Sequence, residues 1–342
     1  MYKDAYKGGK LVKTRVAKYA GKFFDGVQQG YGKSLSAIDY DTPDAKMLQS
    51  LAGNVFHFSA AKNRAEIVAM SSALRDENGK VRGFAEFRRE ASQIVGEFQG
   101  NWLRAEYDLA INAATMAARW TDHSGDANAI LRYRTAGDGR VRPEHKLLDG
   151  ICKPVSDHFW DTYYPPNGWN CRCDAEKTTL RETGDDAIPH RAIDGVPPMF
   201  RSNFAKEGMV FPKDHPYFKA GQPTEKELRK AQIATIRDWA KENLNGKTAQ
   251  HPVIGKVRFT NQGVKEALNQ PHQNFEAKND LIYVLEKALT NAKYVKSIQD
   301  GKGRPFTWHY LETKVNNKAS YIAIKEDGNG TKVFYTITDA IK

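Results

Sequence analysis

Apolar side chains recur every three or four residues in two adjacent stretches of the first half of the chain. The stretches cover residues 84–98 and 101–120, and a similar pattern begins at Ser59 and breaks at the polar turn 76–79. This spacing places the apolar side chains on one face of an α-helix, so it predicts amphipathic helices that pack into a core. The positions on the two faces are Phe84, Phe87, Ala91, Ile94, Val95 and Phe98, then Leu103, Tyr107, Ala110, Ile111, Ala114 and Ala118.

Residues 1–54 show no such period. They mix Lys, Gly, Tyr and Asp and close in a turn-rich stretch around Pro43. We interpret this segment as a basic N-terminal arm.

The helical pattern disappears between residues 133 and 173, where short apolar pieces alternate with Gly, Pro and Asp, which is typical of loops and short strands. Prolines are then frequent between residues 177 and 224, so long helices are not expected there. A polar helix follows at residues 224–244, and Gly246 is placed to end it.

The last ninety residues change character again. We expect a strand at 256–259, a helix at 263–269 and an amphipathic helix from Leu281. Three strands should follow at 306–315, 320–327 and 332–340, the last two joined by the hairpin turn 328–330. The pattern predicts a small α+β domain with a three- or four-stranded antiparallel sheet, and an α+β fold class for the whole chain.

Composition adds a basic balance to this picture. The chain has 342 residues, 40% of them hydrophobic, and a net charge of +11, which favours contact with polyanions. Its three cysteines argue against a secreted disulfide framework. Neither a signal peptide nor a membrane span is recognisable, so we expect no membrane anchor and folding in the cytoplasm.

The segment 133–174 contains an unusual combination of motifs. An Arg-rich loop leads to a His, a Leu-Asp-Gly turn, an aromatic pair, a Pro-Pro-x-Gly-Trp corner and a closing Cys-Arg-Cys. These elements are Arg140, Arg142, His145, Leu148, Asp149, Gly150, Phe159, Trp160, Pro165, Pro166, Gly168, Trp169, Cys171, Arg172 and Cys173.

This run resembles the signature of the Mu F-like phage head-morphogenesis proteins, and the flanking segments extend the resemblance to residues 55–218. The resemblance implies a minor head protein that contacts the portal and other head proteins, in the host cytoplasm during assembly and then in the virion head. It implies no chemistry for this part of the chain.

The cysteines and one histidine of this segment suggest a metal site. In an extended strand Cys171 and Cys173 point to the same face, where a disulfide between them would be strained. Together with His145 and Cys152 they would complete a tetrahedral zinc site, which a loop-rich region with little core would benefit from. The alternative is buried, reduced cysteines beside a core or capping histidine.

Residues 251–342 resemble the phage-borne domains grouped with the barnase, EndoU, colicin and RelE nucleases. The resemblance rests on the order of elements and on pieces such as VRFTNQGVKEALN, WHYLETK and YTITDA. It implies a ribonuclease acting as a toxin or effector, with RNA as substrate and an immunity protein as a further candidate partner.

Metal-free RNA cleavage needs a base, an acid and donors for the phosphate, so we expect no cofactor for this domain. We assign the catalytic roles to His272, His309, Lys314, Thr336 and Thr338, and the RNA-binding roles to Arg304, Trp308 and Tyr310, whose rings can stack on bases. Strand alternation puts His309 on the face opposite Trp308 and Tyr310. We therefore expect His272, Lys314, Thr336 and Thr338 to converge on one basic cleft.

The predicted organisation has four parts: an arm at 1–54, a mostly helical head-morphogenesis domain with a loop-rich Cys/His region at 55–218, a helical linker at 219–250 and the nuclease-like domain at 251–342. Enzymatic activity stays an open question at this point. A rival hypothesis makes the last domain a non-catalytic module that binds nucleic acid or portal. A DNA nuclease is disfavoured, because residues 251–342 show no carboxylate cluster for a divalent metal.

Overall fold

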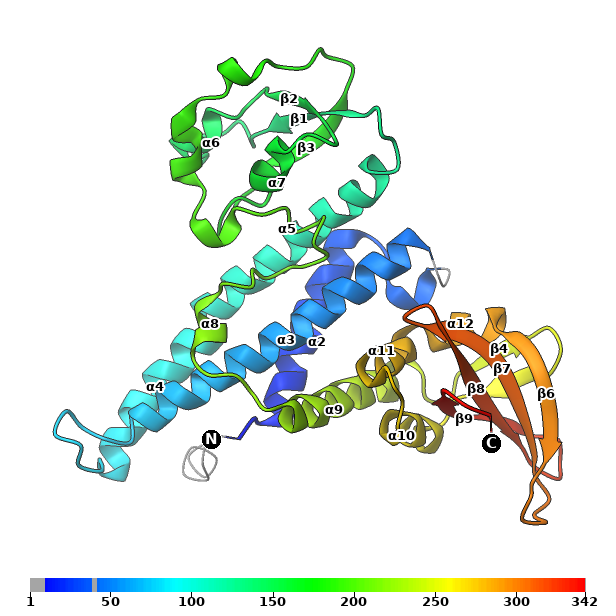
Figure 1. The fold of residues 1–342 in the computed structure, drawn as a ribbon. Helices are drawn as coiled ribbons and strands as arrows, with labels where there is room; N and C mark the ends of the chain where they lie inside the picture. Colours follow the sequence, from blue (N-terminus) through cyan, green and yellow to red (C-terminus); the bar gives the residue numbers. More distant parts are fainter. Residues whose placement is uncertain (1–9, 39–41, 342) are drawn as a thin grey trace. The chain divides into compact units, whose positions relative to one another are not determined.

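The computed structural model describes residues 10–38 and 42–341. The chain divides into two compact units. One gathers Lys22–Ser34 with Lys46–Thr224, and the other gathers Glu225–Lys342 with two N-terminal pieces, Lys13–Gly21 and Leu35–Ala45. The α+β fold class is confirmed, with helices dominating the first unit and a six-stranded sheet in the second (Figure 1).

We interpreted residues 1–54 as a basic arm, but most of the described residues of this segment form helices, so that interpretation is wrong. Helix α2 spans Lys13–Tyr31, a 3-10 turn η1 covers Leu35–Ala37, and helix α3 runs over Pro43–Ser72, while residues 1–9 and 39–41 lie outside the described part. The apolar period of α2 was not recognised in the sequence because the helix contains three glycines, Gly21, Gly26 and Gly30. A side chain at Gly30 would overlap the backbone carbonyl of Ile111, so this position is glycine because another helix approaches closely.

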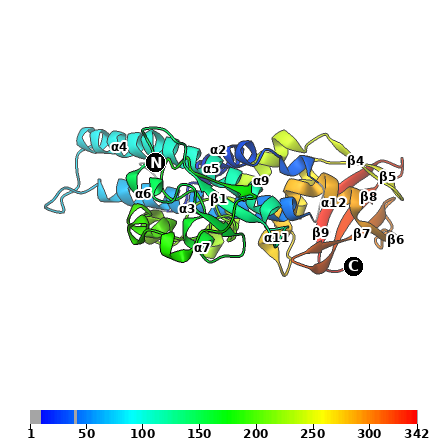
Figure 2. The same ribbon diagram turned by 90° about the horizontal axis from the view of Figure 1, so that it is seen from above.

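The helices expected from the apolar pattern are present. Helix α4 covers Phe84–Gln99 and α5 covers Asn101–His123, and the turn before α4 is held by Asp76, whose side chain accepts the N–H groups of Asn78 and Lys80. Helices α3 and α5 run side by side, as Figures 1 and 2 show. Met70, Phe87 and Ala91 form an apolar cluster between the end of α3 and α4.

The loop-rich region of the first unit is built on a small antiparallel sheet with the order β2-β1-β3. The aromatic side chains of this region supply its core: Trp160 and Tyr164 are fully buried, and the Tyr164 hydroxyl donates to the carbonyl of Met116. The elements are β1 Ile130–Arg134, α6 Pro143–Lys146, β2 Cys152–Pro154, α7 Phe159–Tyr163, β3 Asp174–Thr178, η2 Asp185–Ala187, η3 His190–Gly195, η4 Pro198–Phe200 and α8 Pro216–Lys219.

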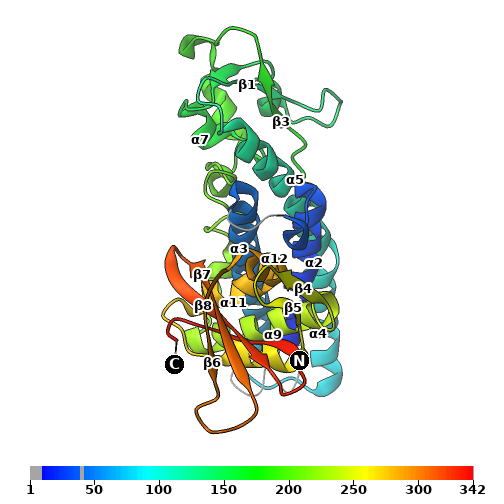
Figure 3. The same ribbon diagram turned by 90° about the vertical axis from the view of Figure 1, so that its right-hand side faces the viewer.

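The second unit contains more strands than the sequence pattern predicted. Its sheet has the order β4-β5-β9-β8-β7-β6, antiparallel except for the parallel pair β5 and β9. Strands β6, β7 and β8 can be followed side by side in Figure 3. The pattern missed β4, which is short, and β6, which is largely exposed. The elements are α9 Glu225–Asn243, β4 Thr248–His251, β5 Gly255–Arg258, α10 Asn261–Asn269, α11 Phe275–Asp280, η5 Leu281–Val284, α12 Leu285–Asn291, β6 Lys293–Gln299, β7 Thr307–Val315, β8 Lys318–Glu326 and β9 Lys332–Thr338.

Helix α9, placed in a linker by the sequence, packs within the second unit. Ala231, Ile236 and Ala240 are buried, and the Gln232 side chain donates to the Asp280 carboxyl at 3.0 Å. The helices lie on one side of the sheet (Figure 1). In the part of the chain that the structure describes, we find no helix with the length and apolar character needed to cross a bilayer.

Candidate functional site

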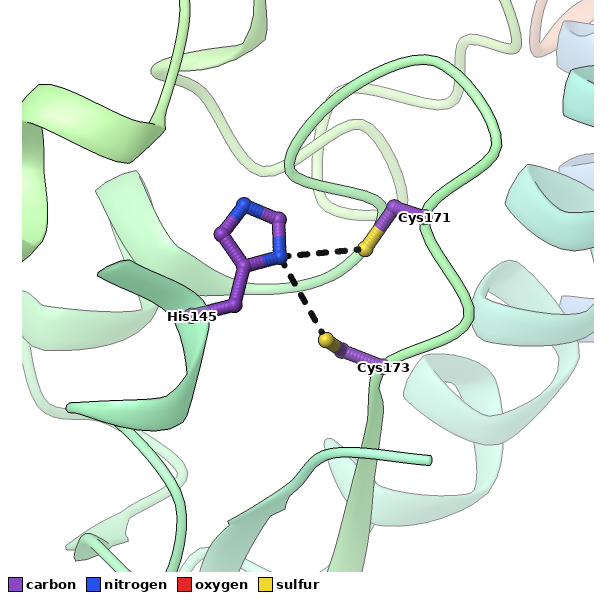
Figure 4. A group of neighbouring side chains, drawn as sticks. All are labelled: His145, Cys171 and Cys173. Atoms are coloured by element: carbon purple, nitrogen blue, oxygen red, sulfur yellow. Dashed lines mark hydrogen bonds between the residues drawn. The ribbon is translucent and has the colours of Figure 1, made fainter. Parts of the chain in front are cut away.

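Three of the four predicted metal ligands come together in the loop-rich region. Cys171 and Cys173 lie at the corner before β3, and His145 comes from α6 (Figure 4). The His145 Nδ1 atom is 3.9 Å from the Cys171 Sγ and 3.5 Å from the Cys173 Sγ. The three potential ligand atoms all lie within 4.8 Å of one another.

Cys152 does not join this group, so its predicted place in the ligand set is wrong. It sits on β2, where its buried thiol donates to the carbonyl of Gly150 at 3.4 Å. Burial raises the pKa of this thiol. The sequence offered Cys152 as one of the two remaining ligands of a tetrahedral ion, but the β1–β2 pairing fixes it elsewhere.

The arginine between the two cysteines has a different partner. Arg172 forms a two-pronged ion pair with Asp138, with both nitrogen–oxygen distances at 2.8 Å. This contact holds the pKa of the Asp138 carboxyl well below its usual range. Arg142 donates to the carbonyl of Trp169 at 2.7 Å. Arg142 and Arg172 therefore hold the corner in place through these contacts, and Asp138 is a partner of the motif that the sequence analysis did not identify.

A second candidate site is a cavity of about 510 Å³ on the sheet of the C-terminal unit. It brings together five residues that the sequence assigned to RNA binding or catalysis: Arg304, Trp308, Tyr310, Thr336 and Thr338. Strand register explains their meeting, because Tyr310 and Thr336 both pair with Ala323 of β8 and so share one face.

The walls of this cavity are aromatic and its rim is charged. Trp308 and Tyr335 meet edge to face with ring centroids 4.9 Å apart. Asp300 accepts from the Trp308 Nε1 at 3.0 Å and from Arg304 at 2.9 Å, and these donors hold the pKa of its carboxyl well below the usual range. The Oγ1 of Thr336 is buried with no hydrogen-bond partner among the described residues.

The histidines and Lys314 do not line the cavity, so the predicted convergence of His272, Lys314, Thr336 and Thr338 is wrong. His272 lies 3.2 Å from the hydroxyl of Ser320, whose side chain is on the opposite face from Thr338 because Thr338 pairs with the next residue of β8. Burial lowers the pKa of His272. Lys314 shares the face of Trp308 but sits at the far end of β7.

His309 lies opposite Trp308, as strand alternation predicted. Its Nδ1 is 2.7 Å from the Ser297 Oγ and its Nε2 is 2.6 Å from the Glu326 Oε2. The carboxyl of Glu326 also contacts Lys332 at 3.4 Å. Neither Ser297 nor Glu326 was expected as a partner of His309. The strand that carries Ser297 was not predicted, and the pairing of β7 with β8 that brings Glu326 close was not assigned from the sequence.

Comparison with known proteins divides the chain in a similar way. Residues 82–176 match the family model described as Phage Mu protein F like protein, and residues 224–335 match the family model described as Large polyvalent protein-associated domain 3. No solved structure shows a significant match.

Two curated proteins are similar to part of this chain. "Putative capsid assembly protein F" of Escherichia phage Mu is 36% identical over 93 residues, which cover 24% of this chain and 21% of that protein. "Mu-like prophage FluMu F protein" of Haemophilus influenzae is 36% identical over 74 residues, covering 22% and 17%. The chain thus spans about a fifth of the length of the relatives it matches, and its residues 82–176 carry a Mu F-like domain.

Proposed function

We propose that this chain is a phage head-morphogenesis protein that contacts the portal and other head proteins. The observation that carries the proposal is the Mu F-like domain at residues 82–176, whose relative in phage Mu is named for capsid assembly. This region folds as long helices joined to the small sheet β2-β1-β3, in which strand β3 directly follows the Cys-Arg-Cys corner. Its place of action would be the host cytoplasm during assembly and then the virion head.

The test is to express the full chain with the portal and major capsid proteins of the phage that encodes it, and to isolate assembled heads by sedimentation. The chain should sediment with heads that contain portal and be absent from heads made without portal. Arg172→Ala, which breaks the pair with Asp138, should reduce its incorporation. Arg104→Ala, which breaks an exposed pair within one helix, is the matched control. A chain that stays soluble in all cases refutes the proposal.

For the C-terminal unit, the cavity supports binding of single-stranded nucleic acid, with RNA as the first candidate. Trp308 and Tyr310 offer rings on which bases can stack, and Arg304 offers a cation for a phosphate. A cavity of about 510 Å³ lies within the usual size range of small-ligand sites. Because the histidines lie elsewhere, this cavity supports binding without cleavage.

A ribonuclease is the second candidate, and the contact between His309 and Glu326 favours it. The carboxylate of Glu326, 2.6 Å from the imidazole, would orient His309 for acid or base work, and the neighbouring Ser297 is exposed. In this version the base and acid work on the opposite face from the cavity. A toxin role and an immunity protein would follow only if cleavage is found.

The two candidates are separated by incubating the full chain with labelled single-stranded RNA or DNA in EDTA. Binding that falls at least tenfold in Trp308→Ala and is retained in Trp308→Phe supports the binding module. Arg304→Ala should weaken binding, while Lys314→Ala, a cation outside the cavity, is its control. Cleavage that is abolished by His309→Ala supports the ribonuclease. Intact RNA together with unchanged binding in Trp308→Ala eliminates both.

A further inference from the structure

We propose that His145, Cys171 and Cys173 bind one zinc ion that fastens the loop-rich region of the Mu F-like domain. The structure assigns three protein ligands to this site, leaves Cys152 outside it, and leaves the fourth position of a tetrahedral ion to water. This inference is independent of the proposed role in head assembly and of the C-terminal cavity.

The spacing of the three ligand atoms suits a tetrahedral ion. Zinc–sulfur bonds of ~2.3 Å and zinc–nitrogen bonds of ~2.0 Å separate neighbouring ligand atoms by roughly 3.5 to 3.8 Å. The His145 Nδ1 lies 3.5 Å from one sulfur and 3.9 Å from the other. All three atoms lie within 4.8 Å of one another, so rotamer adjustments alone can enclose an ion. Figure 4 shows the imidazole nitrogen directed at both sulfurs.

The imidazole is oriented as metal-bound histidines usually are. Its Nε2 lies 3.2 Å from the backbone carbonyl of Gly195, and this acceptor requires a proton on Nε2. The Nδ1 lone pair therefore points toward the two thiols. A carbonyl behind a ligating histidine fixes the tautomer and raises the basicity of the ligating nitrogen. His145 is 1% exposed, so this orientation is built into the fold.

The location also explains what an ion would contribute. The ligands come from two segments, α6 and the corner before β3, and the Gly195 contact adds the 3-10 helix η3 as a third. These segments have few residues in regular structure, and a metal can supply the cross-link that a small core does not. Cys171 and Cys173 precede β3 instead of lying in a strand, and only one residue separates them. A disulfide between cysteines so close in sequence would be strained, so oxidation is a poor alternative use of the pair.

The first test measures metal in the full chain, purified without chelator, by elemental analysis. We expect about one zinc per chain in the wild type and in Cys152→Ser, and at least a tenfold loss in Cys171→Ser, Cys173→Ser and His145→Ala. Cys152→Ser is the matched control, because it removes a buried thiol of the same region. Zinc-free wild type, or a loss of zinc in Cys152→Ser equal to that in the other variants, overturns the proposal.

A second test does not depend on variants that fold poorly. Wild-type protein is treated with an alkylating reagent before and after addition of a strong chelator, and the modified cysteines are identified by mass spectrometry. Zinc should protect Cys171 and Cys173 and release both on chelation, and Co²⁺ added to the stripped protein should produce thiolate-to-metal charge-transfer absorption. Alkylation of the pair at the same rate in both conditions shows that the two thiols are free and refutes the site.

Discussion

Lys62 of α3 and Glu106 of α5 form a buried ion pair, with the Nζ 2.7 Å from the Oε2 and side chains that are 0% and 3% exposed. The Tyr217 hydroxyl donates to the same carboxylate at 2.8 Å. Burial lowers the pKa of Lys62 and raises the pKa of Glu106, while their contact opposes both shifts. The two helices are therefore joined by charges that depend on one another.

The pair predicts a non-additive mutational effect. Lys62→Met should lower the free energy of unfolding by roughly 3 to 5 kcal/mol, because it leaves Glu106 buried without a counter-ion. The double variant Lys62→Met with Glu106→Leu should recover most of this loss. Urea denaturation of the single and double variants measures the coupling, and a double variant as unstable as the sum of the singles contradicts it.

Two glycines of α2 should respond in opposite directions to alanine. Gly30→Ala should destabilise the protein by at least ~1 kcal/mol, because the new Cβ would overlap the carbonyl of Ile111. Gly21→Ala is the control, since nothing lies within 4 Å of its Cβ position, and it should stabilise the helix by roughly 0.5 to 1 kcal/mol. Thermal melts of both variants suffice. Equal shifts in the same direction would mean that α2 does not approach α5 so closely.

The carboxyl of Asp280 predicts a pH dependence of stability. Burial raises its pKa to about 7. A raised folded-state pKa favours the protonated form, so its contribution to stability is fully present below the unfolded pKa of ~3.9 and is lost as the pH rises through about 7. Asp280→Asn should remove this component, and its stability should fall less than that of the wild type between pH 4 and 7. If the free energy of unfolding of the wild type and of Asp280→Asn changes with pH in the same way, the prediction that the Asp280 carboxyl is buried with a raised pKa is wrong.

Limited proteolysis should locate the boundary of the C-terminal unit before α9. Residues 219–226 are largely exposed, whereas α9 buries Ala231, Ile236 and Ala240. Trypsin should therefore cut first at Lys219 or Lys226 and leave a stable fragment that retains α9. N-terminal sequencing of the fragment identifies the cut. A first cut within residues 237–247 would restore the interpretation of this segment as a linker.

The sequence alone determined the elements whose cause is local. Helices α4 and α5 follow from the recurrence of apolar residues every three to four positions, which is the period of an amphipathic α-helix. The hairpin of β8 and β9 follows from alternation around a glycine-rich turn. The Cys-Arg-Cys motif could also be recognised in the sequence, because its residues lie in one continuous segment.

Tertiary structure alone decided which distant residues meet. Cys152 resembled a ligand as closely as His145 did until strand pairing separated it from the other cysteines. His272 was free in sequence to reach either face of the sheet, and its contact with Ser320 places it away from the cavity. The sequence likewise did not predict that His309 contacts Ser297 and Glu326, or that α5 approaches α2 closely at Gly30. The period of apolar residues is a property of one segment and predicts whether that segment forms a helix or a strand. Strand register, close helix packing and the burial of charged groups depend instead on other segments, tens or hundreds of residues away in the sequence.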